Sequence, residues 1–413
     1  MLKKATATLL ILTLISCLSA SVLAEEQPGK GDVPTQQVYL PVYSEYEDLP
    51  PAVPITAIMA EALPAVSAIL IDQHSGRVLF EQNPDEPVAP ASITKVMTLL
   101  IIMEAIESGE VSLQDIVTAS EDAASMGGSQ IWLRVGEQMT VDELLRAVTI
   151  ASANDASFAL AEHIAGSETA FIDRMNTRAQ QLGMTGTSFR NVTGLDEEGH
   201  ITTARDVAIA SRHLIAFDLI REYSTVWMDE LRGGETQLVN TNRLVRFYNG
   251  ATGLKTGTTA QAGSCLAATA TRDGLSLVAV VMGAPNSDSR FAAARGLLDH
   301  GFASYVSVTP PSIADQLTSV RVLRGVEDFV LPVLEAPGSY VVERGQEDKI
   351  EQVVTLAADV EAPVFAGQII GNVEVLVDGS SAGSYPLRAA TGIDRMTFSR
   401  AFGILLRSVL TMR

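Results

Sequence analysis

Two segments with the pattern of a β-hairpin lie far apart in this sequence. The first, residues 67–83, has two apolar runs on either side of a turn at His74-Ser75-Gly76. The second, residues 263–284, has two β-rich runs around Arg272-Asp273-Gly274. Strands therefore stand at both ends of a long region, and this arrangement limits the possible folds more than any other feature.

Helical patterns fill the region between the two hairpins. Apolar residues recur at helical spacing from near Ser92 until Gly109. Further helical pattern covers about 141–165, 168–182 and 203–216. Strands first, helices in the middle and paired strands last predict an α+β fold, in which helices pack on an antiparallel sheet.

The texture of the sequence changes after VTPP, residues 308–311. Short alternating runs such as NVEVLVDG follow, with little helical period, and they predict a separate β-rich domain. With 413 residues, 47% of them hydrophobic, the chain can bury a large core and hold about two domains. We expect a signal peptide at 1–24, a flexible leader at 25–60, the main domain at 61–307, the β-rich domain at 308–390 and an amphipathic helix at 391–413.

Composition excludes two kinds of function. The formal net charge of -20 and a pI near 4.6 argue against binding to the polyanionic backbone of nucleic acids. The sequence has no CxxC and no HExxH spacing, and its five histidines are scattered. We therefore expect neither a metal ion nor another cofactor.

The first residues have the pattern of an export signal. Two lysines precede a short apolar run over about 9–15, and small residues follow up to Ala24. The run is shorter than the roughly 20 residues needed to span a membrane, so we expect cleavage after Ala24 and an exported protein. Alternatively, LISC at 14–17 resembles a lipoprotein signal that would acylate Cys17. Cleavage after Ala24 leaves Cys265 as the one cysteine, which we expect to be a buried strand residue.

Ser92 and Lys95 are three residues apart at the expected start of a helix. At this spacing both side chains lie on one helix face, roughly 5 to 6 Å apart at Cβ, so the amine can reach the serine oxygen. The backbone N–H of Ser92 would also be available in the first turn to stabilise an oxyanion. The two residues could be a nucleophile and its base, although an N-cap serine followed by a surface lysine has the same spacing.

Two further patterns strengthen this hypothesis. Ser152 and Asn154 are two residues apart in an otherwise apolar helical stretch, where such side chains compete with the backbone for hydrogen bonds. Lys255-Thr256-Gly257 precedes the second hairpin, and a small glycine there lets a ligand lie against the strand edge. Each pattern alone is also typical of a helix break or of a turn with a solvated lysine. In order, they match the S-x-x-K, S-x-N and K-T-G set of penicillin-binding proteins and serine β-lactamases.

From about residue 60 to the C-terminus, the chain resembles the low-molecular-mass penicillin-binding proteins that act as D-alanyl-D-alanine carboxypeptidases. The motif spacing fits, as do GGSQIWLRVGE, NVTGLDEEGHITTARD, the β-rich second domain and the terminal helix. The resemblance implies a penicillin-binding domain of the transpeptidase and β-lactamase type at 61–307. It also implies peptidoglycan pentapeptide stems and β-lactam antibiotics as partners.

The resemblance implies a role for each motif residue. Ser92 looks like the nucleophile, Lys95 like its general base, and Ser152 and Asn154 like the pair that relays a proton and holds the substrate amide. The implied substrate-binding residues are Lys255, Thr256 and Gly257 on the docking strand, Thr258 with the second oxyanion N–H, and Arg290 on the carboxylate side.

The chemistry of these residue types agrees with that resemblance. Lys95 must lose its proton to act as a base, and burial close to Lys255 would lower its pKa. The free carboxylate of a peptide needs cationic and hydroxyl partners, which Lys255, Thr256 and Arg290 supply. Such a site favours removal of one C-terminal residue over internal cleavage.

Three alternatives remain open. A β-lactamase needs a group that activates the deacylating water, a glutamate about 36 residues after the middle motif in class A, and GTSFRNVTG at 186–194 contains no acid. A non-catalytic penicillin-binding sensor or scaffold would be acylated without turnover. A Ser-His-Asp hydrolase has little support, because there is no G-x-S-x-G and no histidine is linked to a serine by spacing.

The last 23 residues, 391–413, have the pattern of an amphipathic helix. One continuous helical face carries Phe398, Phe402, Leu405, Val409 and Met412. The segment has four arginines against one aspartate, a local reversal of charge that suits anionic lipid headgroups. We expect a peripheral anchor at the outer face of the cytoplasmic membrane; packing on the β-rich domain is the alternative.

Overall fold

The structure is a computed structural model that describes residues 49–54, 62–334 and 338–411. The expected signal peptide and most of the expected leader lie outside the described residues. Their assignment therefore stays a prediction from the sequence.

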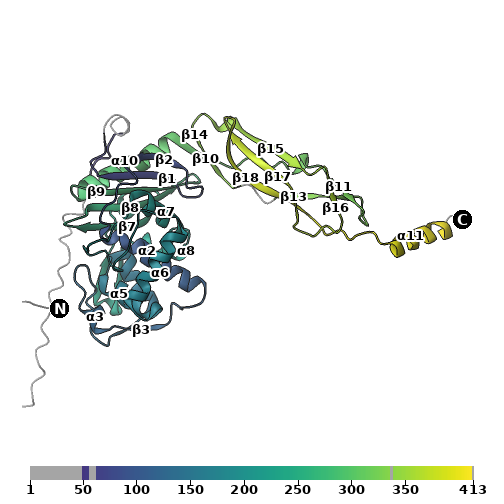
Figure 1. The fold of residues 1–413 in the computed structure, drawn as a ribbon. Helices are drawn as coiled ribbons and strands as arrows, with labels where there is room; N and C mark the ends of the chain where they lie inside the picture. The colour runs from purple at the N-terminus through teal and green to yellow at the C-terminus, as the bar shows by residue number, and fades with distance from the viewer. Residues whose placement is uncertain (1–48, 55–61, 335–337, 412–413) are drawn as a thin grey trace, which may run out of the picture. The chain divides into compact units, whose positions relative to one another are not determined.

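A five-stranded antiparallel sheet organises the first part of the chain (Figure 1). β1 (Ser67–Asp72) and β2 (Val78–Gln82) form the first predicted hairpin, and β8 (Gly263–Arg272) and β9 (Leu275–Ala284) form the second. β1 pairs with β9, and β7 (Ala251–Thr259) pairs with β8, so the strand order is β2-β1-β9-β8-β7. The α+β fold predicted from the sequence is confirmed, because the two distant hairpins join in one sheet.

Alternating side chains of the sheet contribute to two separate cores, because successive residues of a strand point to opposite faces. Ala68 and Leu70 of β1 belong to the core that contains Phe291 and Leu297 of α10 (Ser287–Ser304). Ile69 and Ile71 belong to the larger core formed with the helices that lie between the hairpins in sequence. Cys265 of β8 is fully buried in this larger core, as expected.

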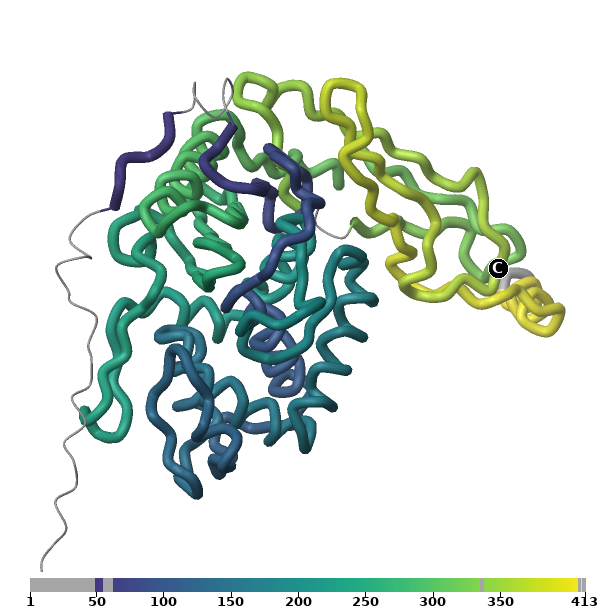
Figure 2. The backbone as a smooth tube through the Cα atoms, turned by 60° about the vertical axis from the view of Figure 1, so that its left-hand side comes forward, coloured from purple at the N-terminus to yellow at the C-terminus, as the bar shows by residue number. Residues whose placement is uncertain are grey.

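The helices between the two hairpins gather on one side of the sheet, opposite α10, as the ribbon and the tube both show (Figures 1 and 2). The longer ones are α2 (Lys95–Glu107), α5 (Asn154–Ala165), α6 (Glu168–Gln181) and α7 (Ala204–Leu214). Shorter elements complete this region: α3 (Glu121–Ala124), α4 (Val141–Arg146), α8 (Asp218–Ser224), α9 (Leu244–Phe247), β3 (Ile116–Thr118), β4 (Gln138–Thr140), β5 (Met228–Leu231) and β6 (Thr236–Val239).

The helix predicted over about 141–165 is broken in the structure. α4 continues as a π-helical turn at Ala147–Ala151, Ser152 then adopts a left-handed conformation with φ of 64°, and α5 begins at Asn154. The backbone N–H of Asn154 donates to Ser129 O at 2.7 Å, a partner outside the helix. The apolar pattern of the sequence continues through the break, because the apolar residues on both sides of it are buried in one core.

The region after α10 is rich in strands, as the sequence predicted. β10 (Tyr305–Val308) pairs with β14 (Tyr340–Glu343), and a four-stranded antiparallel sheet has the order β13-β18-β17-β15. Its strands are β13 (Pro332–Leu334), β15 (Ile350–Leu356), β17 (Ile369–Val377) and β18 (Ser380–Ala389). A smaller sheet contains β11 (Val320–Leu323), β12 (Phe329–Val330) and β16 (Asp359–Glu361).

The last element is α11 (Phe398–Thr411), within the segment predicted to be an amphipathic helix. Phe398, Phe402 and Leu405 are exposed, and so are Ile404, Leu406 and Leu410. The side chains of Val409 and Met412 lie outside the described residues. No helix in the described part of the chain is both long and apolar enough to cross a membrane.

Candidate active site

Ser92 lies in a 3-10 turn, Ala91–Thr94, that leads directly into α2. Ala91 has a φ of 48°, a conformation that is uncommon for a residue with a side chain. The sequence predicted a helix from near Ser92, whereas the α-helix itself begins at Lys95. The turn and the helix together place Lys95 Nζ 3.1 Å from Ser92 Oγ.

Lys95 Nζ is surrounded by oxygen atoms from three segments of the chain. It donates to Asn154 Oδ1 at 2.6 Å and to Thr193 O at 2.7 Å, and it contacts Ser92 Oγ. A neutral amine has two N–H groups and one lone pair. If the two N–H groups engage Asn154 and Thr193, the lone pair is left to accept the Ser92 hydroxyl proton.

The environment of Lys95 favours its neutral form. Burial of the fully enclosed side chain holds the pKa of Lys95 well below its usual value, and the positive charge of Lys255 lowers it further. Asp155 opposes this shift, because its negative charge favours the ammonium form. Desolvation is the largest of these effects, so the pKa of Lys95 moves in the direction that a general base requires.

The strand β7 runs beside the Ser92 turn. A Cβ added to Gly257 would lie 2.9 Å from Ser92 N, so a larger residue at this position would press on the backbone of the turn. Gly194 faces the same turn with a φ of +89°, and a Cβ there would overlap the Ala91 carbonyl. Close approach of β7 to the Ser92 turn therefore depends on Gly257, and close approach of the 190–200 loop to the same turn depends on Gly194.

Lys255 and Thr256 bring a cation and a hydroxyl group to this strand. Lys255 is buried, and its Nζ donates to Thr256 O at 3.0 Å. Burial, with a smaller contribution from the Arg290 charge, lowers the pKa of Lys255 to about 7. The Thr256 hydroxyl donates to Thr241 Oγ1 at 2.7 Å, so a residue that the sequence analysis did not single out orients it.

Arg290 reaches β7 from the first turns of α10. One of its guanidinium nitrogens, Nη1, donates to Gly257 O at 3.0 Å and to Thr258 Oγ1 at 2.9 Å. The residue is nearly buried, and it adds positive charge beside Lys255. Arg290 was the least distinctive of the sequence candidates, yet the structure joins it directly to the K-T-G strand.

Asn154 is fixed by the loop that contains GGSQIWLRVGE. Its Nδ2 donates to Gly127 O at 2.6 Å, which leaves Oδ1 facing Lys95. The neighbouring Asp155 carboxylate accepts the backbone N–H groups of Ile131 and Leu133, and its pKa is raised by burial. The polar loop and the S-x-N motif therefore form one hydrogen-bonded unit.

Ser152 is also buried, at the break between the π-helical turn and α5. Its hydroxyl makes no direct hydrogen bond to Ser92 or Lys95 within the part of the chain that the structure describes. Contacts therefore link Lys95 to Ser92 and Asn154, whereas Ser152 is placed near them only through its position two residues before Asn154.

Two contributors to the site could not be recognised from residue types. The Thr193 carbonyl bonds to Lys95 through a backbone atom, which any residue could supply. His200 is buried, and its Nδ1 accepts the backbone N–H of Arg190 at 3.1 Å, while Nε2 lies 2.8 Å from Thr94 Oγ1. Burial lowers the pKa of His200 to about 4, so a neutral imidazole links the 190–200 loop to the Ser92 turn. The one sequence signal was the NVTGLDEEGHITTARD segment itself.

Two protein-family models match this chain. The model of D-alanyl-D-alanine carboxypeptidases, peptidase family S11, matches residues 55–286, which is more than half of the chain. The chain belongs to this family. The model of the C-terminal domain of penicillin-binding protein 5 matches residues 307–395 of the same carboxypeptidase.

Named relatives agree with this assignment. The carboxypeptidase is 39% identical over 338 residues to D-alanyl-D-alanine carboxypeptidase DacF of Bacillus subtilis, which covers 81% of this chain and 87% of the relative. It is 36% identical over 349 residues to DacC of Escherichia coli, covering 83% and 87% of the two chains.

Solved structures show the same two-part architecture. Penicillin-binding protein 5 from Haemophilus influenzae aligns with a TM-score of 0.71 and 30% identity, covering 81% of this chain and 98% of that one. PBP3 from Streptococcus pneumoniae aligns with a TM-score of 0.69 and 27% identity, covering 81% and 100%. The protein is therefore a serine-type D-Ala-D-Ala carboxypeptidase and a penicillin-binding protein, with a helical and sheet domain followed by a β-rich domain.

Proposed function

We propose that this carboxypeptidase removes the terminal D-alanine of peptidoglycan pentapeptide stems through an acyl-enzyme on Ser92, with Lys95 as general base. The contacts around Lys95 Nζ carry the proposal. Acceptors at 2.6 Å on Asn154 and 2.7 Å on Thr193 can engage both N–H groups of the neutral amine. The remaining lone pair is then available to Ser92 Oγ, 3.1 Å away.

Acylation begins when Ser92 Oγ attacks the carbonyl carbon of the penultimate D-alanine and its proton moves to Lys95 Nζ. The resulting oxyanion accepts hydrogen bonds from the backbone N–H groups of Ser92 and Thr258. The C–N bond then breaks, and the departing amine of the terminal D-alanine takes up the proton, with the Ser152 hydroxyl as the relay. Asn154 holds the substrate amide while this occurs.

Deacylation uses the same base in its neutral form. Lys95, having returned its proton, accepts one from a water molecule that attacks the ester carbonyl, and Ser92 Oγ leaves with that proton. A β-lactam would be attacked by Ser92 in the same way, with opening of its ring in place of loss of D-alanine.

Three side chains would bind the carboxylate of the terminal D-alanine. Lys255 and Arg290 supply positive charge, and Thr256 supplies a hydroxyl group along the edge of β7. Both cations are almost fully buried, so their attraction for a carboxylate is screened less than it would be on the surface. This arrangement favours peptides with a free C-terminus.

Release of D-alanine from a pentapeptide that ends in D-Ala-D-Ala tests the proposed reaction. We expect one D-alanine per peptide, no cleavage at internal bonds and a transient adduct on Ser92 detectable by mass spectrometry. Covalent penicillin labelling without D-alanine release would support a non-catalytic sensor instead. Rapid hydrolysis of penicillin without D-alanine release would support a β-lactamase.

The same proposal includes export and the division of the chain. Residues 1–24 would direct export and be removed, and residues 25–60 would link the mature N-terminus to the catalytic domain at 61–307. The β-rich domain at 308–390 would separate that domain from the C-terminal helix. The enzyme would then act at the outer face of the cytoplasmic membrane.

We propose that α11 is the peripheral membrane anchor. Its large described apolar side chains are exposed to solvent, which is unusual for a helix that packs on its own domain. The segment 391–413 also concentrates four arginines against one aspartate in an acidic chain. A helix of this kind can lie in the plane of the lipid interface, with its apolar face among the acyl chains.

Deletion of residues 391–413 from a chain that begins at Glu25 tests the anchor. We expect D-alanine release to stay within about twofold of the longer chain, because none of the candidate catalytic residues is removed. Sedimentation with vesicles of anionic and zwitterionic lipid should be lost. Undiminished binding by the shortened chain would place the anchor elsewhere, and acylation of Cys17 would be the next candidate.

A further inference from the structure

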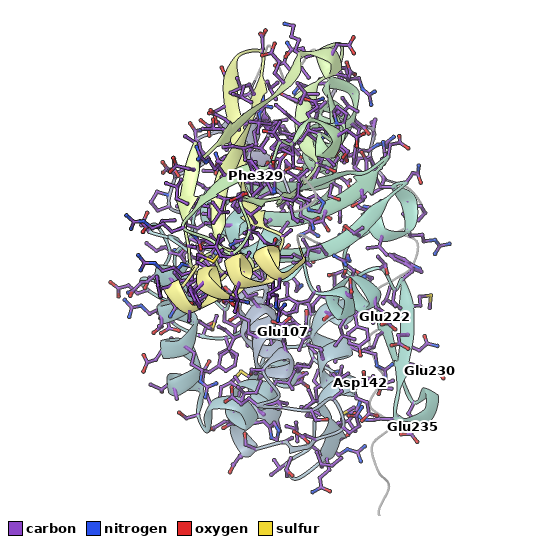
Figure 3. The ribbon with its side chains drawn as sticks, turned by 90° about the vertical axis from the view of Figure 1, so that its right-hand side faces the viewer. Glu107, Asp142, Glu222, Glu230, Glu235 and Phe329 are labelled. Atoms are coloured by element: carbon purple, nitrogen blue, oxygen red, sulfur yellow. The ribbon has the colours of Figure 1, made fainter. Side chains whose placement is uncertain are left out.

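The β-rich region exposes several large apolar side chains outside α11. Phe329, labelled in Figure 3, is 58% exposed and belongs to the strands of this region. The others are Leu331 at 63%, Val333 at 50%, Phe365 at 69% and Ile369 at 60%, with Val353 the least exposed at 43%. Single exposed apolar residues are common on protein surfaces, but a group of them marks an interaction site.

Two of these residues are linked through the register of the four-stranded sheet. Val333 of β13 lies opposite Arg388 of β18, and Arg388 lies opposite Ile369 of β17. Cross-strand partners share a face of the sheet, so Val333, Arg388 and Ile369 form one row. Leu331 directly precedes β13, and its carbonyl accepts the backbone N–H of Ala390 at 2.9 Å.

Phe365 lies four residues before Ile369 and next to the segment that leads into α11. The turn at 363–368, here called the Phe365 turn, leads directly into Ile369, and Gly367 N donates to Ala389 O at 2.9 Å. Val364 and Ile393 exchange both backbone hydrogen bonds, at 2.8 and 2.9 Å. The most exposed phenylalanine of the β-rich region therefore lies next to the segment that leads into the helix.

That segment is short and is tied down at a second point. Met396 N donates to Arg324 O at 2.8 Å, only two residues before α11 begins at Phe398. Four residues lie between Ile393 and Phe398, and an extended chain spans at most about 3.4 Å for each residue step. The Phe365 turn consequently lies within roughly 20 Å of the first residue of α11, wherever the helix points.

The charges around this turn do not make a strongly cationic surface. Arg324 and Arg395 both contact Glu361, and Arg400 contacts Asp394. The carboxylates of Glu361 and Asp394 therefore weaken the attraction of these arginines for anionic headgroups. The Phe365 turn would interact with a lipid surface through its apolar side chains, and salt does not screen this hydrophobic interaction.

We propose that the Phe365 turn is a second membrane contact, in which Phe365 enters the interfacial layer of the bilayer beside α11. Ile369 would lie at the edge of this layer, and the row toward Val333 would face the headgroups. The inference rests on the proposed anchoring by α11, because the helix holds the turn near the lipid. The contact would fix the orientation of the β-rich domain on the membrane, because two separate contacts prevent the domain from rotating about the helix.

Vesicle binding by the chain that begins at Glu25 measures the contribution of Phe365. Burial of a phenylalanine side chain in an apolar layer predicts roughly tenfold weaker partitioning for Phe365→Ser on vesicles of anionic and zwitterionic lipid. Val353→Ser is the matched control, since Val353 is 43% exposed and lies opposite Glu374, five residues along β17 from Ile369. The Phe365→Ser effect should persist at high salt, whereas binding that depends on arginines should weaken.

A fluorescent label locates the turn directly. In the same chain, Phe365→Cys carries an environment-sensitive fluorophore, and buried Cys265 leaves the introduced thiol as the reactive one. We expect a blue shift and quenching by brominated lipid at position 365, and neither change for Val353→Cys. A label that stays in water while the chain sediments with vesicles would overturn the second contact alone.

Two other results would have different meanings. If the unsubstituted chain does not sediment with vesicles, or if deletion of 391–413 leaves binding intact, the α11 anchor fails and this inference fails with it. A shift of the label without vesicles that grows with protein concentration would indicate that a second copy covers the surface, and would also overturn the lipid contact.

Discussion

Ser92→Ala is expected to abolish both D-alanine release and covalent labelling by penicillin. The serine oxygen forms the acyl bond, so its removal leaves no atom that can hold the acyl group. We expect D-alanine release to fall by at least about a thousandfold, because substrate binding alone cannot replace covalent catalysis. Ser112→Ala removes an exposed hydroxyl group twenty residues after Ser92, outside the candidate site, and should leave both activities unchanged.

Lys95→Ala should cause a loss of the same order, and the double variant should be no worse than either single one. Residues that act as one unit lose their joint contribution when either is removed, so the effects do not add. Removal of Lys95 also leaves Asn154 Oδ1 and Thr193 O without this donor, so thermal unfolding should be measured in parallel. Lys349→Ala, at an exposed lysine, is the control.

A penicillin adduct on Ser92→Ala would contradict the assignment of the nucleophile. Losses that add in the double variant would contradict the claim that Lys95 acts through Ser92. A properly folded Lys95→Ala variant with normal labelling rates would mean that another group takes the serine proton.

Amidation of the peptide C-terminus is expected to reduce kcat/KM roughly a hundredfold. The amide lacks the negative charge that Lys255 and Arg290 attract, and loss of one partner of a buried charged pair costs about 2 to 5 kcal/mol. Arg290→Ala should lower kcat/KM for the acid much more than for the amide, and so remove most of the preference. Arg295→Ala, on the same helix with a more exposed side chain, should keep the preference.

The preference for the acid should also depend on pH. Lys255 attracts the carboxylate only when protonated, and its pKa in the free enzyme is lowered to about 7. The ratio of kcat/KM for acid and amide should therefore be high below pH 7 and fall as the pH rises through that value. Deprotonation of Lys95 affects both peptides equally and cancels in the ratio. A ratio of one at every pH would mean that the carboxylate is not recognised.

Local sequence patterns determined the main elements of this fold correctly. Glycine turns at Gly76 and Gly274 between apolar runs predicted both hairpins, because backbone conformation at a tight turn depends on the residues within it. The apolar period predicted the helices near Ser92 and at 168–182, since amphipathic spacing reflects one buried face. The three motifs, read together, also identified the residues around Lys95 and along β7.

The break at Ser152 was decided by tertiary structure. The backbone N–H of Asn154 donates to the Ser129 carbonyl, and the Asp155 carboxylate accepts hydrogen bonds from backbone N–H groups of the loop at 131–133. These partners lie more than twenty residues away in sequence, so the apolar pattern within 141–165 could not predict the break. The apolar residues stay apolar through the break, because the core buries them on both sides.

The remaining parts of the site depend on atoms that the sequence cannot distinguish. The Thr193 carbonyl that bonds to Lys95 is a backbone group, which every residue has. Thr241 contacts Thr256, 15 residues away in sequence, and His200 contacts Thr94, 106 residues away. Residue types at 92, 95 and 154 predicted the chemistry that we propose for this protein. The protonation of Lys95 and Lys255 was decided by tertiary structure, through the packing of the 190–200 loop and of β7 against the Ser92 turn. Burial and distance set the pKa of each lysine, and both are properties of the folded chain.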